Sequence, residues 1–360
     1  MVRIKNEELI NLNLSFNKLL TWFLDDRSCC LELDGDHRSL EIASHLSANF
    51  KLLSSSKIEQ QKITEYQPDK FSLKSYQDLK DEKYIMKIND IYEFVNNYLG
   101  KYITNFIIHG SLATFDFSKG WSDVDTFVVL KNSTLLSPKK LYEFRALCLK
   151  LKKIFYKLCP LQHHGLIVFS EDDLNNYSSF FIPHQILNSS IEFLNSAAKV
   201  KLKIKYDEEV SDELLTIKRL ESLKKDLGKA IVSGKLCHHP YKRECLENNY
   251  KNAKNSMRQL FWLLGNIMTM PAYLLTAIGK PCEKKFSFKK AETLYSKDSL
   301  KFIESVSKIR TEWELLEGTS YKGNSIPSWI QNKLDGNYFE RFFNLLEETL
   351  EIINQKNSCS

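Results

Sequence analysis

The residues best suited to chemistry lie between positions 107 and 129. A short apolar run ends in His109-Gly110-Ser111, and after eleven intervening residues the chain reads Asp123-Val124-Asp125 at the head of a second apolar run. Glycine has no Cβ and lets the backbone come close to a ligand, while neighbouring N–H groups and a serine hydroxyl suit phosphate oxygens. We therefore expect Gly110 and Ser111 to bind phosphate groups.

The two aspartates are placed to share a cation. Alternate side chains of a strand point to the same face, so Asp123 and Asp125 should lie together while Val124 enters the core. Two carboxylates held this close repel each other unless a cation lies between them. Mg²⁺ fits best because it prefers oxygen ligands and accompanies triphosphates, and Mn²⁺ suits the same ligands. The pair thus predicts a divalent-metal site.

This segment resembles the nucleotidyltransferase superfamily of DNA polymerase β type, and looks closest to small bacterial members such as the aminoglycoside nucleotidyltransferases. The family motif is an apolar residue, Gly-Ser, a spacer and D-x-D within a strand, and it is matched here by Gly110, Ser111, Asp123 and Asp125, with Ser122 before the first aspartate. The resemblance implies that both aspartates hold metal ions, and that the Gly-Ser turn and Ser122 bind a nucleoside triphosphate. It also implies transfer of a nucleoside monophosphate to an acceptor hydroxyl, with release of pyrophosphate.

The chain departs from the family at the third carboxylate, which normally lies on the strand after the next helix. Residues 161–169 contain no acid but do contain His163 and His164. A neutral imidazole can accept a proton from an attacking hydroxyl, and adjacent strand residues face opposite ways, so we expect only His164 to serve. The alternative is a nucleotide-binding or regulatory protein that keeps the fold without turnover.

The spacer after Ser111 offers few cations, so the charge of a triphosphate must be balanced elsewhere. The densest basic cluster lies at residues 280–290, and within it Lys284 and Lys285 are the candidates for the phosphates. The formal net charge of +6 is too modest for a dedicated nucleic-acid binder, and RNA is an unlikely partner on this reasoning. The acceptor could be a sugar, an antibiotic, a protein side chain or an RNA end.

The elements that position these residues indicate an α+β protein with a mixed sheet, followed by a helical domain. Helical spacing at 76–102 and 138–157 alternates with strands at 103–108, 124–130 and 161–169. Further helices are expected near 184–198, 211–233, 247–279, 297–317 and 336–354. We expect an accessory lobe over 1–75, the catalytic domain over 76–182 and the helical domain over 183–360.

Several features favour a cytoplasmic protein. The first residues lack the apolar core of a secretory signal, and the eight cysteines form no CxxC pair, so we expect reduced thiols. Cys237 and Cys245 flank two histidines, but their spacing matches no standard zinc site. The uncharged stretch 260–279 contains Gly265 and Pro271, and we interpret it as a buried helix rather than a membrane span. The oligomeric state is left open.

Overall fold

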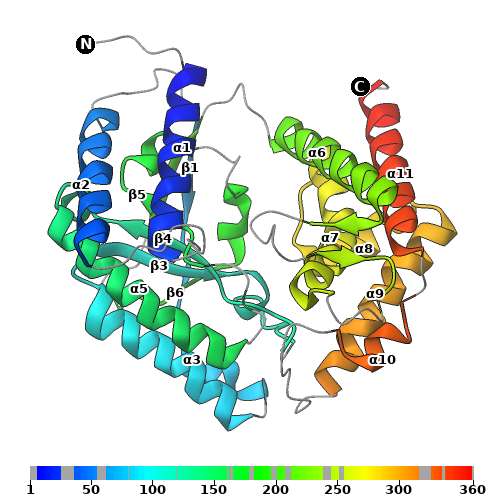
Figure 1. Cartoon of the computed structure of the whole chain (residues 1–360), viewed down its shortest axis with the longest axis horizontal. Coiled ribbons are helices and arrows are strands. Elements are labelled where there is room, and N and C mark those ends of the chain that lie inside the picture. Colours follow the sequence, from blue (N-terminus) through cyan, green and yellow to red (C-terminus); the bar gives the residue numbers. More distant parts are fainter. Residues whose placement is uncertain are drawn as a thin grey trace. The chain divides into compact units, whose positions relative to one another are not determined.

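The computed structural model describes most of the chain in two compact units, residues 1–209 and 210–360 (Figure 1). The described residues are 6–25, 36–54, 62–79, 81–118, 120–159, 162, 165–177, 182–195, 201–206, 212–237, 245–250, 255–315, 326–334 and 337–358. The mixed α+β class expected from the sequence is confirmed. The division differs from the three segments expected, because residues 1–75 and 183–206 both contribute elements to the first unit.

The first unit is built on a five-stranded mixed sheet with the order β2-β6-β3-β4-β5. Its central strands β3 and β4 are antiparallel, β5 is parallel to β4, and β6 is antiparallel to β3 and parallel to β2. The strands are β2 (Asp69–Lys70), β3 (Ile103–His109), β4 (Asp125–Leu130), β5 (Val168–Ser170) and β6 (Ile191–Glu192). The two strands predicted around the Gly-Ser and D-x-D motifs are therefore confirmed as neighbours, while the third is shorter than expected.

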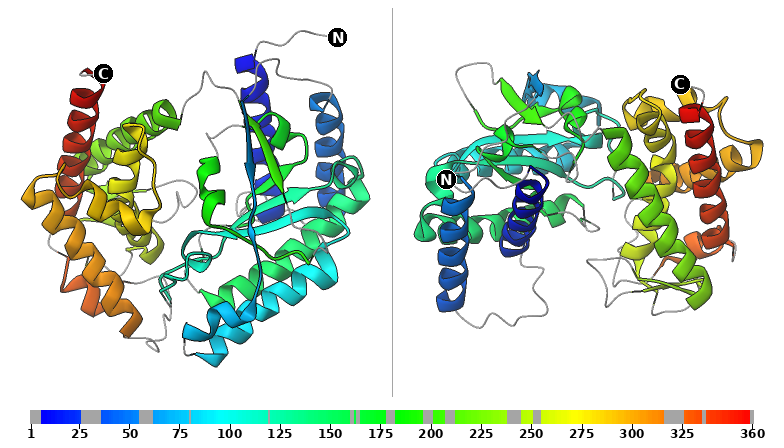
Figure 2. Two further views of the ribbon diagram at one scale, coloured as in Figure 1. Left: turned by 180° about the vertical axis from the view of Figure 1, so that it is seen from behind. Right: turned by 90° about the horizontal axis from the view of Figure 1, so that it is seen from above.

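Apolar side chains cover both faces of this sheet. One face packs against a layer of helices. The other face packs against the separate two-stranded pair of β1 and β7 and against the short helix η5. The right-hand view of Figure 2 shows α1 and α2 on the side of the sheet opposite β1. The helical layer comprises α1 (Asn6–Asp25), α2 (Asp36–Leu53), α3 (Glu82–Phe94) and α5 (Pro138–Leu158). The remaining elements of this unit are β1 (Lys62–Tyr66), β7 (Leu202–Tyr206), α4 (Asn132–Leu135) and the short helices η1 (Leu73–Leu79), η2 (Val95–Leu99), η3 (Gly110–Leu112), η4 (Asp173–Asn175) and η5 (His184–Ser189).

Local sequence explains where the main helices begin. Ser137 caps α5 by accepting a hydrogen bond from the Lys140 N–H, and Pro138 occupies the first turn, where its missing N–H costs nothing. Asp81 caps α3 in the same way through the Tyr84 N–H. The helix expected over 184–198 is wrong, because this segment forms η5 and then β6, which pairs with β3.

The N-terminal segment does not form a lobe of its own because α5 binds the end of α1. Arg145 Nε donates to the Phe23 carbonyl (2.9 Å), and Lys152 Nζ donates to the Asp25 carbonyl (2.5 Å). Lys152 Nζ also lies 3.0 Å from the buried Asp25 carboxylate. These cations satisfy carbonyls that a helix end leaves without intrahelical partners. A Cβ on Gly165 would lie 2.2 Å from the same carboxylate, so glycine is required where α1 meets the approach to β5.

The second unit is helical, as predicted, from residue 212 onward. Its helices are α6 (Asp212–Ser233), α7 (Met257–Ala277), α8 (Lys284–Ala291), α9 (Lys297–Leu315), α10 (Ser328–Gln331) and α11 (Tyr338–Ser358). Among the described helices, α7 alone is long and apolar enough to cross a membrane by length and composition. It packs against α6, α8, α9 and α11, and Leu260, Leu264 and Ile267 are fully buried, so α7 is a core helix of this unit.

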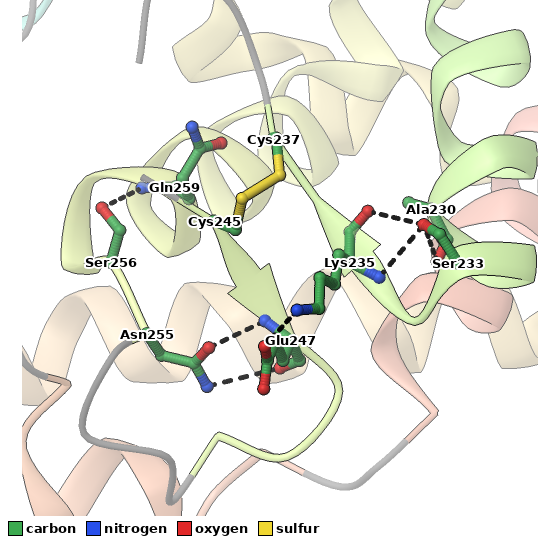
Figure 3. Close-up of a disulfide and its surroundings, with 9 residues drawn as sticks. All are labelled: Ala230, Ser233, Lys235, Cys237, Cys245, Glu247, Asn255, Ser256 and Gln259. Carbon is green, nitrogen blue, oxygen red and sulfur yellow. Dashed lines mark hydrogen bonds and ion pairs between the residues drawn. A yellow bond between two sulfur atoms is a disulfide. The ribbon is translucent and has the colours of Figure 1, made fainter. Parts of the chain in front are cut away.

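Two cysteines of the second unit form a disulfide (Figure 3). The short strands β8 (Lys235–Leu236) and β9 (Leu246–Glu247) pair antiparallel and bring Cys237 opposite Cys245, with their Cα atoms 4.5 Å apart. This separation lies in the range that a disulfide needs. The expectation of reduced thiols is therefore wrong for this pair, and the disulfide also accounts for both sulfur atoms without a zinc ion.

The ion pair between Asp25 and Lys152 provides a test of how α1 is held. In Lys152→Ala the buried Asp25 carboxylate loses its ion pair with Lys152, and we expect the free energy of unfolding to fall by about 3–5 kcal/mol. Lys153→Ala, on the exposed side of the same helix, should change it by less than about 0.5 kcal/mol. Urea denaturation of the two variants measures this, and equal stabilities would show that the pair does not anchor α1.

Candidate functional site

The Gly-Ser motif forms the turn at the end of β3. Gly110 has φ +69°, in the left-handed region that favours glycine, and a Cβ at this position would lie 2.4 Å from Asp125 Oδ2. The backbone of the turn thus lies directly against one carboxylate of the D-x-D motif. Glycine is required at position 110 both by the backbone conformation and by this close approach.

Hydrogen bonds inside the turn fix its shape. The N–H groups of Ala113 and Thr114 both donate to the Gly110 carbonyl (3.1 and 3.0 Å), and the Asp116 N–H donates to the Ser111 carbonyl (3.2 Å). Ser111 is only partly buried, and its hydroxyl has no hydrogen-bond partner among the described residues. The predicted phosphate-binding hydroxyl is therefore available at the start of the turn.

Ser122, unlike Ser111, is buried and hydrogen-bonded. It is buried, its hydroxyl accepts a hydrogen bond from the Ser118 N–H (2.9 Å), and its own N–H donates to the Ser118 carbonyl (2.8 Å). These bonds close the loop that precedes the aspartates. The structure thus gives Ser122 a role in loop geometry, and its part in phosphate binding stays a prediction.

Both aspartates lie at the end of β3. His109 is the register partner of Asp125 in the antiparallel ladder, so the two side chains share a face of the sheet. Asp123 is close enough to His109 to influence the pKa of the imidazole. Val124, between the acids, is fully buried in the core on the helical side of the sheet, while both acids are only partly buried. This burial pattern agrees with the predicted alternation, although β4 begins only at Asp125 and Asp123 precedes the strand.

His109 is a site residue that the sequence analysis did not single out. Burial lowers the pKa of its imidazole to about 4, although the negative charge of Asp123 and a hydrogen bond with the Thr126 backbone act in the opposite direction. The Nε2 atom is buried without a hydrogen-bond partner among the described residues. His109 is therefore a neutral imidazole at pH 7, packed against the acidic pair. The signal that could have found it is its place directly before the glycine.

Gln162 was also missed. Its side-chain amide bonds both backbone groups of Val124, the residue between the two acids. A lone glutamine in a loop carries no sequence signal of this kind, because the contact joins residues 38 positions apart.

For three predicted site residues the structure gives no position relative to the acidic pair. His164, like its neighbour His163, lies outside the described residues. Lys284 and Lys285 are exposed at the start of α8 in the second unit, and their predicted role with a triphosphate stays a prediction.

The two carboxylates of Asp123 and Asp125 suit a magnesium ion that is bound together with substrate phosphates. No group of three or more His, Cys, Asp or Glu side chains in the described part of the chain is arranged to hold a metal ion. Mg²⁺, however, is commonly bound by one or two carboxylates together with substrate phosphates and water, rather than by a complete protein cage. The pair Asp123 and Asp125, beside a turn that suits phosphates, fits that mode of binding.

Comparison with known proteins adds no relative. No protein-family model, no curated protein and no solved structure matches this chain. The arguments about function accordingly depend on the motif and on the geometry described above.

The close approach at Gly110 can be separated from its backbone conformation by comparing two glycines. Gly234 has the same φ of +69°, but nothing lies within 4 Å of its Cβ position. Gly234→Ala should therefore cost only the left-handed conformation, about 1–2 kcal/mol. Gly110→Ala should cost about 1–3 kcal/mol more because the methyl group displaces Asp125. Chemical denaturation monitored separately for each unit measures both costs, and equal losses would argue against the contact with Asp125.

The burial of His109 predicts how stability depends on pH. Its pKa of about 4 in the folded state lies below the ordinary value of 6.5, so the unfolded chain binds the proton more readily between these values. The contribution of the neutral imidazole to the free energy of unfolding is fully present above pH 6.5. As the pH falls toward 4 this contribution is lost, and the free energy of unfolding decreases by at most about 3 kcal/mol. His109→Phe should show a shallower decline in the free energy of unfolding over this range, measured with a chelator present. Parallel curves for wild type and variant would contradict the burial of a neutral histidine.

Proposed function

We propose that this protein is a metal-dependent nucleotidyltransferase, which moves a nucleoside monophosphate from a nucleoside triphosphate to an acceptor hydroxyl. One observation carries the proposal: the Gly110-Ser111 turn lies against the Asp125 carboxylate, and Asp123 is close enough to His109, the register partner of Asp125, to influence its pKa. A phosphate-binding turn and a paired carboxylate are thereby joined at one end of two adjacent strands.

Each group has a role that follows from its chemistry. Asp123 and Asp125 would hold Mg²⁺ or Mn²⁺, which when bound neutralises phosphate charge and aligns the reacting groups. The Ser111 hydroxyl would bind a phosphate oxygen, and Gly110, which has no Cβ, would let the phosphate come close to the backbone. The acceptor oxygen attacks the α-phosphorus, the bond from the α-phosphorus to the bridging oxygen breaks, and pyrophosphate leaves. Catalysis of this kind depends mainly on positioning.

The proton of the acceptor hydroxyl needs a base. His164 keeps the role that the sequence analysis predicted, as a neutral imidazole that accepts this proton, and Lys284 and Lys285 keep theirs as cations for the triphosphate. The acceptor itself is not named by any of these residues. In place of RNA, for which the modest net charge gives little support, a small molecule or a protein side chain is favoured.

The absence of a third carboxylate supports a second candidate function. No acidic group joins Asp123 and Asp125 in a set of three among the described residues. A chain with this site would bind a metal–triphosphate complex and act through binding, as a regulatory or nucleotide-sensing protein, without turnover. Release of pyrophosphate distinguishes the two candidates.

The decisive experiment incubates the protein with each labelled nucleoside triphosphate, with Mg²⁺ or Mn²⁺, and measures both pyrophosphate and labelling of the protein itself. Pyrophosphate release that requires the metal supports the enzyme. Metal-dependent binding without pyrophosphate supports the regulatory candidate, and the absence of any binding would reject both.

Substitution of the aspartates tests the site directly. Asp123→Asn and Asp125→Asn each remove a metal ligand while relieving repulsion, so we expect folding to be retained and the affinity for the metal–triphosphate complex to fall by at least about 100-fold. Asp90→Asn is the matched control, because it makes the same change at an exposed aspartate of α3 in the same unit. Titration calorimetry with metal present measures the affinities. Wild-type affinity in both Asp123 and Asp125 variants would overturn the proposed site.

A further inference from the structure

The backbone of Val124 is bound at both of its polar groups by one side chain. Gln162 Oε1 accepts a hydrogen bond from the Val124 N–H (2.8 Å), and Gln162 Nε2 donates to the Val124 carbonyl (3.1 Å). Val124 is the residue between Asp123 and Asp125. Whatever fixes its backbone also fixes the relative direction of the two carboxylates.

Among the described strands, none is paired with Val124 to bond its backbone N–H and C=O groups. The ladder between β3 and β4 ends at the pair His109 and Asp125, and the ladder between β4 and β5 begins at Val128. Val124 is fully buried, and buried N–H and C=O groups that lack partners cost about 1–3 kcal/mol each. The Gln162 amide therefore takes the place of a neighbouring strand beyond the end of the sheet.

The double contact constrains the conformation of Val124. In an extended backbone the N–H and C=O groups of one residue point to the same side, whereas in a helix they point in opposite directions along the axis. One planar amide can bond both groups only when the residue is extended. An extended Val124 is also the condition under which the side chains of Asp123 and Asp125 share a face.

Gln162 is itself held firmly. It follows the end of α5, where the Cys159 N–H donates to the Phe155 carbonyl (2.8 Å) and the Gln162 N–H donates to the Cys159 carbonyl (3.0 Å). Its side chain is only 2 % exposed. The Val124 N–H requires the amide oxygen and the Val124 carbonyl requires the amide nitrogen, so the amide has one orientation.

We propose that Gln162 is a positioning residue for the acidic pair: it holds Val124 extended so that Asp123 and Asp125 converge on one metal–triphosphate complex. This inference rests on the proposed nucleotidyltransferase function. It connects the end of α5 to the metal site without any contact between Gln162 and the substrate.

Asn96 offers a matched control in the same unit. Its amide also bonds the backbone at more than one place: Nδ2 donates to the Tyr92 and Phe193 carbonyls (2.7 and 2.9 Å), and Oδ1 accepts from the Asn195 N–H (2.6 Å). Phe193 and Asn195 follow β6, which β3 separates from β4 in the sheet. Asn96→Leu therefore removes a comparable set of amide–backbone bonds away from the strand that carries Asp125.

The experiment compares Gln162→Met, Gln162→Asn and Asn96→Leu with wild type by two measurements. Hydrogen exchange of the Val124 amide reports on the clamp, and calorimetry with each Mg²⁺–nucleoside triphosphate reports on the site. We expect Val124 exchange to accelerate and the affinity to fall by about 10–100-fold in both Gln162 variants, and neither to change in Asn96→Leu. Gln162→Asn keeps an amide and removes one methylene, so it serves where the methionine variant does not fold.

The outcomes separate the two proposals. Faster Val124 exchange with wild-type affinity would overturn the positioning role and leave the proposed function standing. Equal loss of affinity in Asn96→Leu would show that any comparable destabilisation has this effect, and would also overturn it. If wild type binds no metal–triphosphate, the proposed function fails and the positioning role with it, while slow Val124 exchange would still establish the clamp as a structural contact.

Discussion

The arrangement of the candidate site depends on the close approach of the Gly110 backbone to the Asp125 carboxylate. A turn and a carboxylate can share this space only because residue 110 has no Cβ and adopts a positive φ. The antiparallel pairing of β3 with β4 then places His109 opposite Asp125, and Asp123 is close enough to His109 to influence its pKa. One backbone requirement thus brings together the acidic pair and the turn for which phosphate binding is predicted.

Buried polar side chains hold the ends of the sheet where strand pairing stops. Gln162 bonds the Val124 backbone at the head of β4. On the β6 side, Glu192 accepts hydrogen bonds from the Phe106 and Leu194 N–H groups and from Asn105, and burial raises the pKa of its carboxyl. Because each of these groups lies out of water, its loss leaves donors or acceptors unsatisfied. Short strands can form a defined sheet here because side chains complete their hydrogen bonds.

The N-terminal helix α1 is held by the same helix, α5, that leads to Gln162. Lys152 and Arg145 of α5 bind the last carbonyls of α1, and the Asp25 carboxylate fills the space beside Gly165. The helix that carries these cations also ends at the loop containing Gln162. Residues in the middle of α5 therefore hold the end of α1. The C-terminal end of α5 sets the position of Gln162, whose amide bonds the Val124 backbone.

The sequence by itself determined the long elements and the motif. Short apolar runs rich in β-branched residues located β3 and β4, and helical spacing located α5, α6, α9 and α11, because these signals are local. Gly110, Asp123 and Asp125 were predicted as one site because their types and spacing are specific to a chemistry. The tertiary structure decided the rest. The two-residue strand β6, the disulfide between Cys237 and Cys245, and the contacts of His109 and Gln162 arise from residues far apart in the chain, or from strands too short to have a period. Single residues of this kind acquire their roles through burial and hydrogen bonding, which depend on the neighbours that folding brings to them.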